Sequence, residues 1–248
     1  PATLTGAQSQ GYNRGSLNLL CEGYTMRKSS HVVGRIALFA ALGLVAAGTA
    51  NAADWPQLRG DALRTGVSSE KLLPPLTLAW RFTAGSQTLN GAAPVIAGDT
   101  AYFAARAATG GSLYAVDVAT GEKRWEFPGG NGLPRGVNFP VSPVIADGKV
   151  YAVTSDGILY ILNAKTGKKA QPEYELGEAV AAAPVVTDGV IYLSTSSGRV
   201  HAMRADTYEA VWKADYNIGD PIVGAPIVAS NMVYLQTLGN VIHAVAQG

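Results

Sequence analysis

Ser142–Tyr151 reads SPVIADGKVY, and the chain repeats this pattern three more times. In each copy an apolar run follows a proline, a turn comes next, and a second apolar run ends in tyrosine. Each copy predicts two strands joined by a tight hairpin, because Asp–Gly steps readily adopt the positive φ angles that such turns need. The other copies are Ala93–Tyr102, Ala183–Tyr192 and Ala225–Tyr234, and the four prolines are spaced by 49, 41 and 42 residues.

A third strand is predicted after each tyrosine. In the first copy, Thr120-Gly121 then leads to a fourth strand that ends at Trp125. Three or four short antiparallel strands, repeated at this interval, are typical of β-propeller blades, and the apolar spacing of a long helix is missing from the repeats. We therefore predict an all-β fold of four-stranded antiparallel blades, with third strands at Leu113–Val116, Ile158–Leu162, Val200–Met203 and Val241–Val245.

Composition sets limits on function. The 248 residues are 48% apolar and 15% charged, which excludes a disordered chain. The formal net charge of +1 gives no basic footprint for nucleic acid. Cys21 is the one cysteine of the sequence, so neither an intrachain disulfide nor a cysteine metal cluster can form.

Residues 26–52 have the pattern of a signal peptide. Basic residues precede the apolar stretch Ile36–Gly48, and Ala50-Asn51-Ala52 resembles a cleavage site. The apolar stretch has 13 residues, whereas a membrane-spanning helix needs about 20. We predict cleavage after Ala52 and export to the periplasm or the extracellular space, with no stable membrane insertion afterwards. Residues 1–25 are interpreted as a non-native upstream segment, 53–75 as a lead-in, and 76–248 as the propeller.

One motif carries a family resemblance. Ala115-x-Asp117-x-x-Thr120-Gly121-Glu122-x-x-Trp125, together with the strand pair described above, resembles the blade repeat of PQQ-like β-propellers. That family includes quinoprotein dehydrogenases and the outer-membrane assembly factor BamB. Its members usually have seven or eight blades, so the resemblance implies that the four blades here are part of a larger ring.

The last copy stops after its third strand, and the stretch Leu76–Phe82 precedes the first copy as an isolated strand with a tryptophan. Two readings follow. The isolated strand completes the last blade by pairing with Val241–Val245, or further blades are missing. We expect the second.

In the resembling family, the motif tryptophan docks between neighbouring blades. The resemblance assigns this structural role to Trp80, Trp125 and Trp212. The second blade has Gln171 where tryptophan is expected, and we expect Gln171→Trp to stabilise the protein.

A longer loop, Pro128–Pro140, separates the first two copies. Binding residues often lie on such loops above a rigid scaffold. Arg135, Asn138 and Phe139 are therefore the candidate partner-binding residues.

No catalytic, cofactor-binding or metal-binding residue is predicted. His201 and His243 are one repeat apart and take the same place as Tyr114 and Tyr160 in their blades, which favours packing over a metal pair. Quinoprotein alcohol dehydrogenases hold PQQ with a vicinal cysteine pair, a stacking tryptophan, a Ca²⁺ site and an aspartate base, and the cysteines have no counterpart after residue 52. We expect no cofactor unless missing blades supply a PQQ site.

The resemblance implies a non-catalytic, exported scaffold that binds a protein partner, similar in kind to BamB. One alternative is a fragment of a PQQ-dependent quinoprotein dehydrogenase. A second alternative is a polymer-binding or sensor propeller domain.

Overall fold

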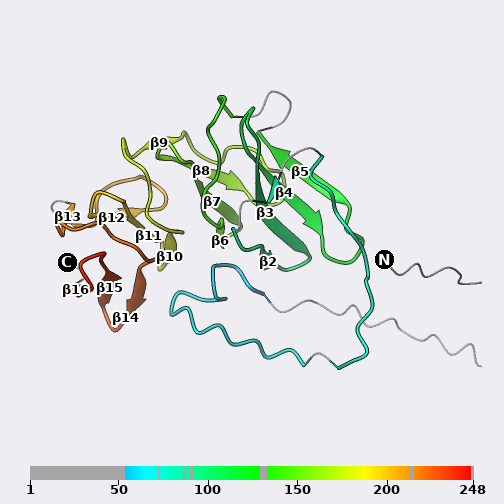
Figure 1. Ribbon diagram of the computed structural model, residues 1–248, viewed down its shortest axis with the longest axis horizontal. Coiled ribbons are helices and arrows are strands. Elements are labelled where there is room, and N and C mark those ends of the chain that lie inside the picture. Colours follow the sequence, from blue (N-terminus) through cyan, green and yellow to red (C-terminus); the bar gives the residue numbers. More distant parts are fainter. Residues whose placement is uncertain are drawn as a thin grey trace, which may run out of the picture. The chain divides into compact units, whose positions relative to one another are not determined.

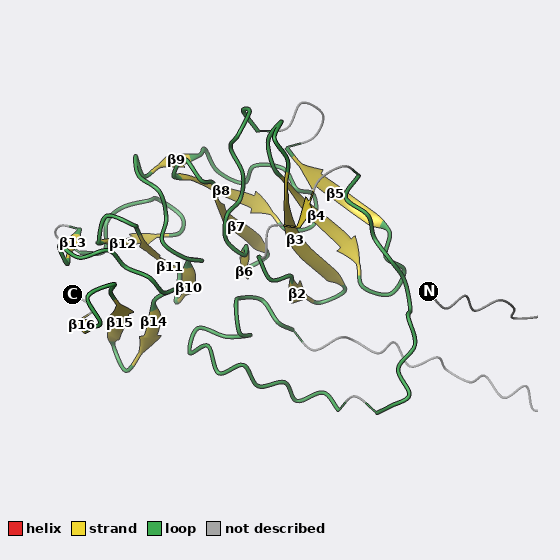
Figure 2. Cartoon of the chain, in the orientation of Figure 1, coloured by secondary structure: helices red, strands yellow, loops and turns green. Residues whose placement is uncertain are grey.

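A computed structural model describes residues 54–71, 73–85, 88–89, 92–128, 133–212 and 215–246. Every regular element in this part of the chain is a β-strand (Figure 2). No helix long and apolar enough to cross a membrane occurs among these residues. The predicted signal peptide and the segment before it lie outside the described residues.

The strands form four antiparallel sheets, one for each sequence repeat (Figure 1). Blade 1 contains β1 (Thr88–Leu89), β2 (Val95–Ala97), β3 (Thr100–Arg106), β4 (Ser112–Asp117) and β5 (Lys123–Phe127). Blade 2 contains β6 (Val144–Ala146), β7 (Lys149–Val153), β8 (Ile158–Asn163) and β9 (Tyr174–Glu175). Blade 3 contains β10 (Val185–Thr187), β11 (Val190–Ser194), β12 (Arg199–Arg204) and β13 (Tyr216–Asn217), and blade 4 contains β14 (Ile227–Ala229), β15 (Met232–Gln236) and β16 (Ile242–Ala246). The predicted all-β propeller blades are confirmed.

The repeat register is the same in all four blades. The tyrosine that ends each sequence copy lies opposite the first residue of the preceding strand, in the pairs Val95↔Tyr102, Val144↔Tyr151, Val185↔Tyr192 and Ile227↔Tyr234. This register brings the apolar side chains of each strand pair to matching faces, because successive side chains of a strand point to opposite sides.

The hairpin turns have the backbone that their residues predict. Asp147-Gly148 and Asp188-Gly189 have φ angles of 49° and 69°, and of 50° and 70°. Ser230-Asn231 adopts the same shape with φ angles of 49° and 62°, although neither residue is glycine. Two successive positive φ angles match the right-handed twist of the strands that the turn joins.

Most of the hydrophobic core consists of layers between blades, and a smaller cluster packs Tyr114 of blade 1 against Trp80 and Phe82. One layer joins blade 1 to blade 2 and includes Trp125, Phe139 and Val150. A second layer joins blades 2 and 3 around Tyr151 and Ile191, and a third joins blades 3 and 4 around Trp212 and Val233. Each blade therefore depends on its neighbours to bury its faces, as in other repeat proteins.

The lead-in segment crosses the first strands of successive blades. Trp55 exchanges backbone hydrogen bonds with Ile96 in β2, and the amide of Ile145 in β6 donates to the Pro56 carbonyl. Gln57 Nε2 lies 3.5 Å from the Val186 carbonyl in β10. Three consecutive residues of the segment thus reach equivalent places in blades 1, 2 and 3.

Arg64 holds the end of the lead-in segment against blades 3 and 4. Its Nε donates to the Pro226 carbonyl at 3.0 Å, and its guanidinium also reaches the Ala183 carbonyl at 3.4 Å. The side chain is buried, and this burial lowers the pKa of Arg64 to about 10. Backbone carbonyls are the partners that make such a buried cation tolerable.

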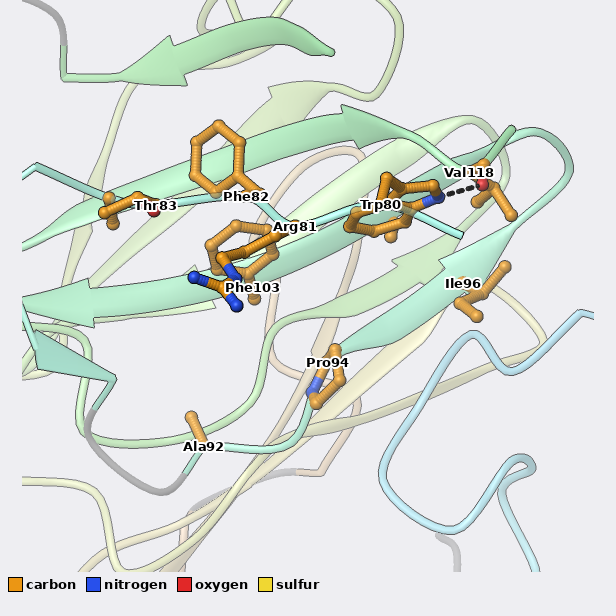
Figure 3. Close-up of a pocket in the computed structure, with 11 residues that line it drawn as sticks. Trp80, Arg81, Phe82, Thr83, Ala92, Pro94, Ile96, Phe103 and Val118 are labelled. Atoms are coloured by element: carbon orange, nitrogen blue, oxygen red, sulfur yellow. Dashed lines mark hydrogen bonds between the residues drawn. The ribbon is translucent and has the colours of Figure 1, made fainter. Parts of the chain in front are cut away.

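Blade 4 has three strands in the described chain, and β16 is at its edge. Residues 76–84 are not assigned to a strand, although Trp80, Phe82 and Ala84 pack against blade 1 (Figure 3), and no described pairing joins them to β16. The isolated strand predicted at Leu76–Phe82 is therefore absent as a paired element.

Candidate functional site

The three predicted docking tryptophans are the most specific residues of the repeat. Trp125 is a residue of β5, and its side chain lies against the turn that follows β8 of blade 2. There its Nε1 donates to the Ala164 carbonyl at 2.8 Å. A Cβ placed on Gly167 in that turn would be 2.6 Å from the indole ring. The tryptophan therefore needs both the carbonyl and the bare glycine of the next blade.

Trp80 makes the same contact one blade earlier. Its Nε1 donates to the Val118 carbonyl at 2.7 Å, and a Cβ on Gly121 would be 2.7 Å from its ring. Trp80 thus docks on blade 1 as Trp125 docks on blade 2. The aspartate or asparagine at the start of each turn holds the backbone in place: Asp117 accepts the amide hydrogens of Ala119 and Thr120, and Asn163 does the same for Lys165 and Thr166.

Trp212 is buried between blades 3 and 4, and its ring lies 6.2 Å from that of Tyr192. Its Nε1 finds no acceptor among the described residues. By the repeat register, the equivalent carbonyl belongs to residue 247, which lies outside the described part of the chain.

Blade 2 departs from the repeat at Gln171. Its Nε2 donates to the Ala205 carbonyl at 3.0 Å, the same place in blade 3 that receives the tryptophan N–H in blades 1 and 2. The glycine of this turn is replaced by Tyr208, which keeps the left-handed backbone with φ of 62°. The Tyr208 hydroxyl reaches back to the Pro172 carbonyl at 2.7 Å.

The missing tryptophan is therefore replaced by two residues, one on each blade. Gln171 supplies the hydrogen bond, and Tyr208 supplies the aromatic ring from the opposite side. A tryptophan at position 171 would meet the Tyr208 Cβ, since the equivalent Cβ on Gly167 would be 2.6 Å from Trp125. The expectation that Gln171→Trp stabilises the protein is contradicted by this geometry.

Two of the three predicted partner-binding residues make contacts within the protein. Phe139 is fully buried in the layer between blades 1 and 2, and its ring lies 6.3 Å from that of Tyr160. Asn138 accepts the Ala107 amide hydrogen and donates to the Gly136 carbonyl. Arg135 alone of the three candidate residues is exposed and can meet a partner without rearrangement of the loop.

An exposed apolar patch lies at the turn after β15, and the sequence analysis did not predict it. Leu238, Val241 and Val223, here called the Leu238 patch, are 66%, 48% and 49% exposed. Two hydrogen bonds hold the turn: Leu238 N donates to Pro221 O at 2.8 Å, and Gly239 N donates to Asp220 Oδ2 at 2.8 Å. The repeats do contain a signal for it, because Ser155 and Ser196 occupy the place of Leu238 in blades 2 and 3.

His201 and His243 lie in equivalent places on β12 and β16, opposite Leu193 and Leu235. His201 is buried, with Nδ1 3.0 Å from Asp215 Oδ1 and Nε2 3.6 Å from Glu178 Oε1. No group of three or more His, Cys, Asp or Glu side chains in the described residues is arranged to hold a metal. The geometry gives His201 a place in a polar network on one blade rather than in a histidine pair.

Two features of the described residues bear on the PQQ site that only the dehydrogenase alternative would need. Trp80 and Trp125 each pack one ring face against a turn glycine of the next blade. The described ranges also contain no cysteine. The expectation of no cofactor stays a prediction for the protein as a whole.

Sequence and structure comparisons agree with the blade pattern. The family described as outer membrane protein assembly factor BamB matches residues 77–245. No curated protein sequence matches significantly.

Three solved structures illustrate the likeness. BamB from Moraxella catarrhalis is 20% identical with a TM-score of 0.52, and the alignment covers 68% of this chain and 49% of that one. The computationally designed Ika4 protein is 13% identical with a TM-score of 0.57, over 69% of this chain and 99% of that one. Quinohemoprotein alcohol dehydrogenase from Comamonas testosteroni is 22% identical with a TM-score of 0.55, over 77% of this chain and 36% of that one. The chain thus spans about half the length of the solved BamB, and these likenesses concern the fold.

Proposed function

We propose that this chain, which belongs to the family described as outer membrane protein assembly factor BamB, is an exported, non-catalytic scaffold that binds a protein partner in the cell envelope. The family description suggests the class of partner: a protein that takes part in outer-membrane protein assembly. The observation that carries the proposal for this chain is the Leu238 patch.

The patch has the properties of a contact surface. Loops on a rigid β scaffold are common places for binding residues, and a cluster of exposed apolar side chains is unusual compared with single ones. Thr237 N donates to Val241 O at 3.0 Å, and Val223 N donates to Gln236 O at 3.0 Å, so the backbone under the patch is already ordered. Binding to an ordered loop loses little conformational entropy.

One acidic residue lies next to the patch. Asp220 lies beside it, but its carboxylate already accepts the Gly239 amide hydrogen. An apolar centre with a polar rim is the usual arrangement of protein interfaces, in which a few central side chains supply most of the binding energy. Leu238, the most exposed of the three, is the expected central residue.

The test is affinity capture from an envelope extract with the tagged chain, followed by titration of the purified captured protein. Leu238→Ser gives blade 4 the residue found at this turn position in blades 2 and 3. We expect it to weaken binding about tenfold, as loss of a central interface residue does. Val67→Ser is the matched control, because Val67 is 76% exposed and lies outside the patch.

Equal binding by the Leu238→Ser and Val67→Ser variants would remove the patch from the interface. Arg135→Ala in the same assay tests the one exposed candidate of the loop before β6. Dye-linked alcohol oxidation with added PQQ and Ca²⁺ tests the dehydrogenase alternative, and turnover there would overturn the non-catalytic proposal.

A further inference from the structure

The imidazole ring of His201 has one nitrogen with a hydrogen-bond partner and one without. His201 lies on β12 and is 6% exposed, and its Nδ1 is 3.0 Å from Asp215 Oδ1. Its Nε2 is buried and has no hydrogen-bond partner among the described residues. A buried polar atom without a partner costs free energy and therefore needs an explanation.

Asp215 determines which nitrogen of His201 carries the proton. A carboxylate accepts hydrogen bonds, so in the neutral imidazole the contact at Nδ1 needs the N–H on that side. The proton is therefore assigned to Nδ1 from this contact. The Nε2 atom then has a lone pair that can accept a hydrogen bond or bind a cation.

A second carboxylate faces this lone pair. Glu178 belongs to the loop that leads from β9 of blade 2 to β10 of blade 3, and its Oε1 is 3.6 Å from His201 Nε2. A charge-assisted N–H···O hydrogen bond is about 2.7–2.9 Å long, so this separation is too long for one. Two acceptor atoms thus face each other, and a cation between them would remove their repulsion.

The separation of these two atoms fits a bound zinc ion. Zinc binds histidine nitrogen and carboxylate oxygen at about 2.0–2.2 Å, and a tetrahedral angle then places the two ligand atoms about 3.4 Å apart. The observed separation of 3.6 Å is close to this value. A histidine that binds zinc usually donates its other N–H to a carboxylate or carbonyl, as His201 does to Asp215.

A polar hollow beside Glu178 can supply water to such an ion. Glu178, Ser197 and Arg199 border this hollow, which has a volume of about 360 Å³. Ser197 Oγ donates to Glu178 Oε2, the carboxylate oxygen farther from His201. No third His, Cys, Asp or Glu of the described chain completes a metal-binding group. Water therefore has to fill the remaining coordination positions, as it does in zinc sites with an open position.

Arg199 is the cation that would compete with a metal ion for Glu178. Its Nε is 3.8 Å from Glu178 Oε1, and its side chain is 54% exposed. An ion pair this exposed contributes little free energy, so the arginine can turn towards solvent at small cost. Removal of its charge should strengthen the binding of a cation at this place and weaken the binding of an anion.

We propose that Glu178 and His201 bind one Zn²⁺ ion, and that Asp215 is a positioning residue that orients the imidazole. The ion joins the loop that leaves blade 2 to the third strand of blade 3. The repeat pattern gives no sign of this site, because the two carboxylates around His201 come from loops and not from the repeated strands.

The test is titration of the full chain with ZnCl₂ by isothermal titration calorimetry at neutral pH, with protein purified without a histidine tag. His243→Gln is the matched control for His201→Gln, because the two histidines have equivalent places on β16 and β12. Cys21 and His31 are kept in every variant. Any zinc that these two residues bind is therefore a background common to all variants.

We expect His201→Gln and Glu178→Gln to weaken zinc binding at least tenfold, and His243→Gln to leave it unchanged. Asp215→Asn should weaken it by about tenfold or more, as loss of the carboxylate behind a ligating histidine does. Arg199→Gln should strengthen it. Nitrogen-15 NMR of the imidazole rings should show that zinc shifts the Nε2 signal of His201, an effect that a purely structural role would not produce.

Equal zinc affinity of the His201→Gln and His243→Gln chains would overturn the site, and so would weaker binding by Arg199→Gln. Calcium prefers oxygen ligands alone, so calcium binding as tight as zinc binding would also overturn it. Thermal unfolding without zinc shows whether each variant folds. If His201→Gln does not fold, Glu178→Gln and Arg199→Gln still decide the test. Partner capture through Leu238 is measured separately, so either proposal can fail without the other.

Discussion

At the scale of single residues, one contact recurs through the molecule. An indole N–H from one blade meets a turn carbonyl of the next, and the ring covers a glycine with positive φ, as seen for Trp125 over Gly167. The hydrogen bond satisfies a buried donor, and the ring removes apolar surface from water. The contact therefore stabilises the packing of neighbouring blades and also fixes their relative position.

Trp125→Ala is expected to lower the free energy of unfolding by about 3–5 kcal/mol, as truncation of a large buried aromatic does. The side chain is 9% exposed and takes part in the layer between blades 1 and 2. Urea unfolding followed by circular dichroism measures the change. A cost below about 1 kcal/mol would mean that blade docking does not depend on this residue.

Substituting two glycines allows the contribution of tryptophan docking to stability to be distinguished from that of backbone strain. Gly148 and Gly167 have φ angles of 69° and 67°, but a Cβ meets nothing within 4 Å at Gly148 and meets Trp125 at 2.6 Å at Gly167. Gly148→Ala should cost about 1–2 kcal/mol for the left-handed backbone. Gly167→Ala should cost clearly more, and equal urea midpoints for the two variants would contradict the docking contact.

The carboxyl group of Asp117 is expected to make the stability of the fold depend on pH. Its hydrogen bond with Arg124 lowers the pKa of Asp117 to about 2. A carboxyl with a lowered pKa in the folded state stabilises it above the ordinary pKa near 3.8, and this stabilisation is lost as pH falls towards 2. The melting temperatures of wild type and Asp117→Asn should therefore differ at pH 5 and converge between pH 4 and pH 2. A constant difference over that range would rule out this carboxylate as the cause.

At the scale of elements, the turn after the third strand of each blade carries the docking surface. It begins with Asp117 or Asn163 and ends with glycine in blades 1 and 2, whereas blade 3 has Arg204 and Tyr208. The amide of Tyr208 still donates to the Arg204 carbonyl at 3.0 Å, as that of Gly121 donates to Asp117 at 2.9 Å. The turn keeps its shape although both of its end residues differ, because Tyr208 accepts a positive φ.

The Gln171–Tyr208 replacement predicts strong coupling between the two positions. Gln171→Trp alone should destabilise the protein, because the new ring meets the Tyr208 Cβ. Tyr208→Gly alone should also destabilise it, since it removes the ring that packs 5.1 Å from Tyr174. The double variant restores the tryptophan–glycine contact, so a double-mutant cycle in urea should show a favourable coupling of at least about 1 kcal/mol. If the effects of the two substitutions on the free energy of unfolding simply add, Gln171 and Tyr208 do not jointly replace the tryptophan–glycine contact.

At the scale of the whole molecule, stability depends on packing between blades. The layers between the blades contain the buried tryptophans and tyrosines, and the lead-in segment with Arg64 ties blade 3 to blade 4 through backbone carbonyls. After removal of residues 1–52 the sequence would contain no cysteine. An oxidising compartment would then neither help nor harm the fold.

Export is the prediction that concerns the whole chain. Expression in a Gram-negative host followed by fractionation should release a protein whose N-terminal sequence begins at Ala53 or within a few residues of it. Replacing Ala50 and Ala52 by bulky residues should block processing, because signal peptidase needs small residues there. A mature protein that still contains Met26 would overturn the predicted signal peptide.

Local sequence patterns by themselves determined the four recognisable repeats, the strand order within each blade and the hairpin turns, whereas the docking role of Trp125 was implied by the family resemblance. The repeats, strands and turns depend on apolar alternation and on turn residues within about ten positions, so they are visible without coordinates. Only the tertiary structure showed the features that depend on contacts between residues far apart in the sequence. Phe139 lies in a core layer rather than on a binding surface. Gln171 is matched by Tyr208 of the next blade, and Arg64 reaches Pro226, which is 162 residues away. The sequence pattern could not show these pairings, because burial and hydrogen bonding between blades depend on how the sheets pack.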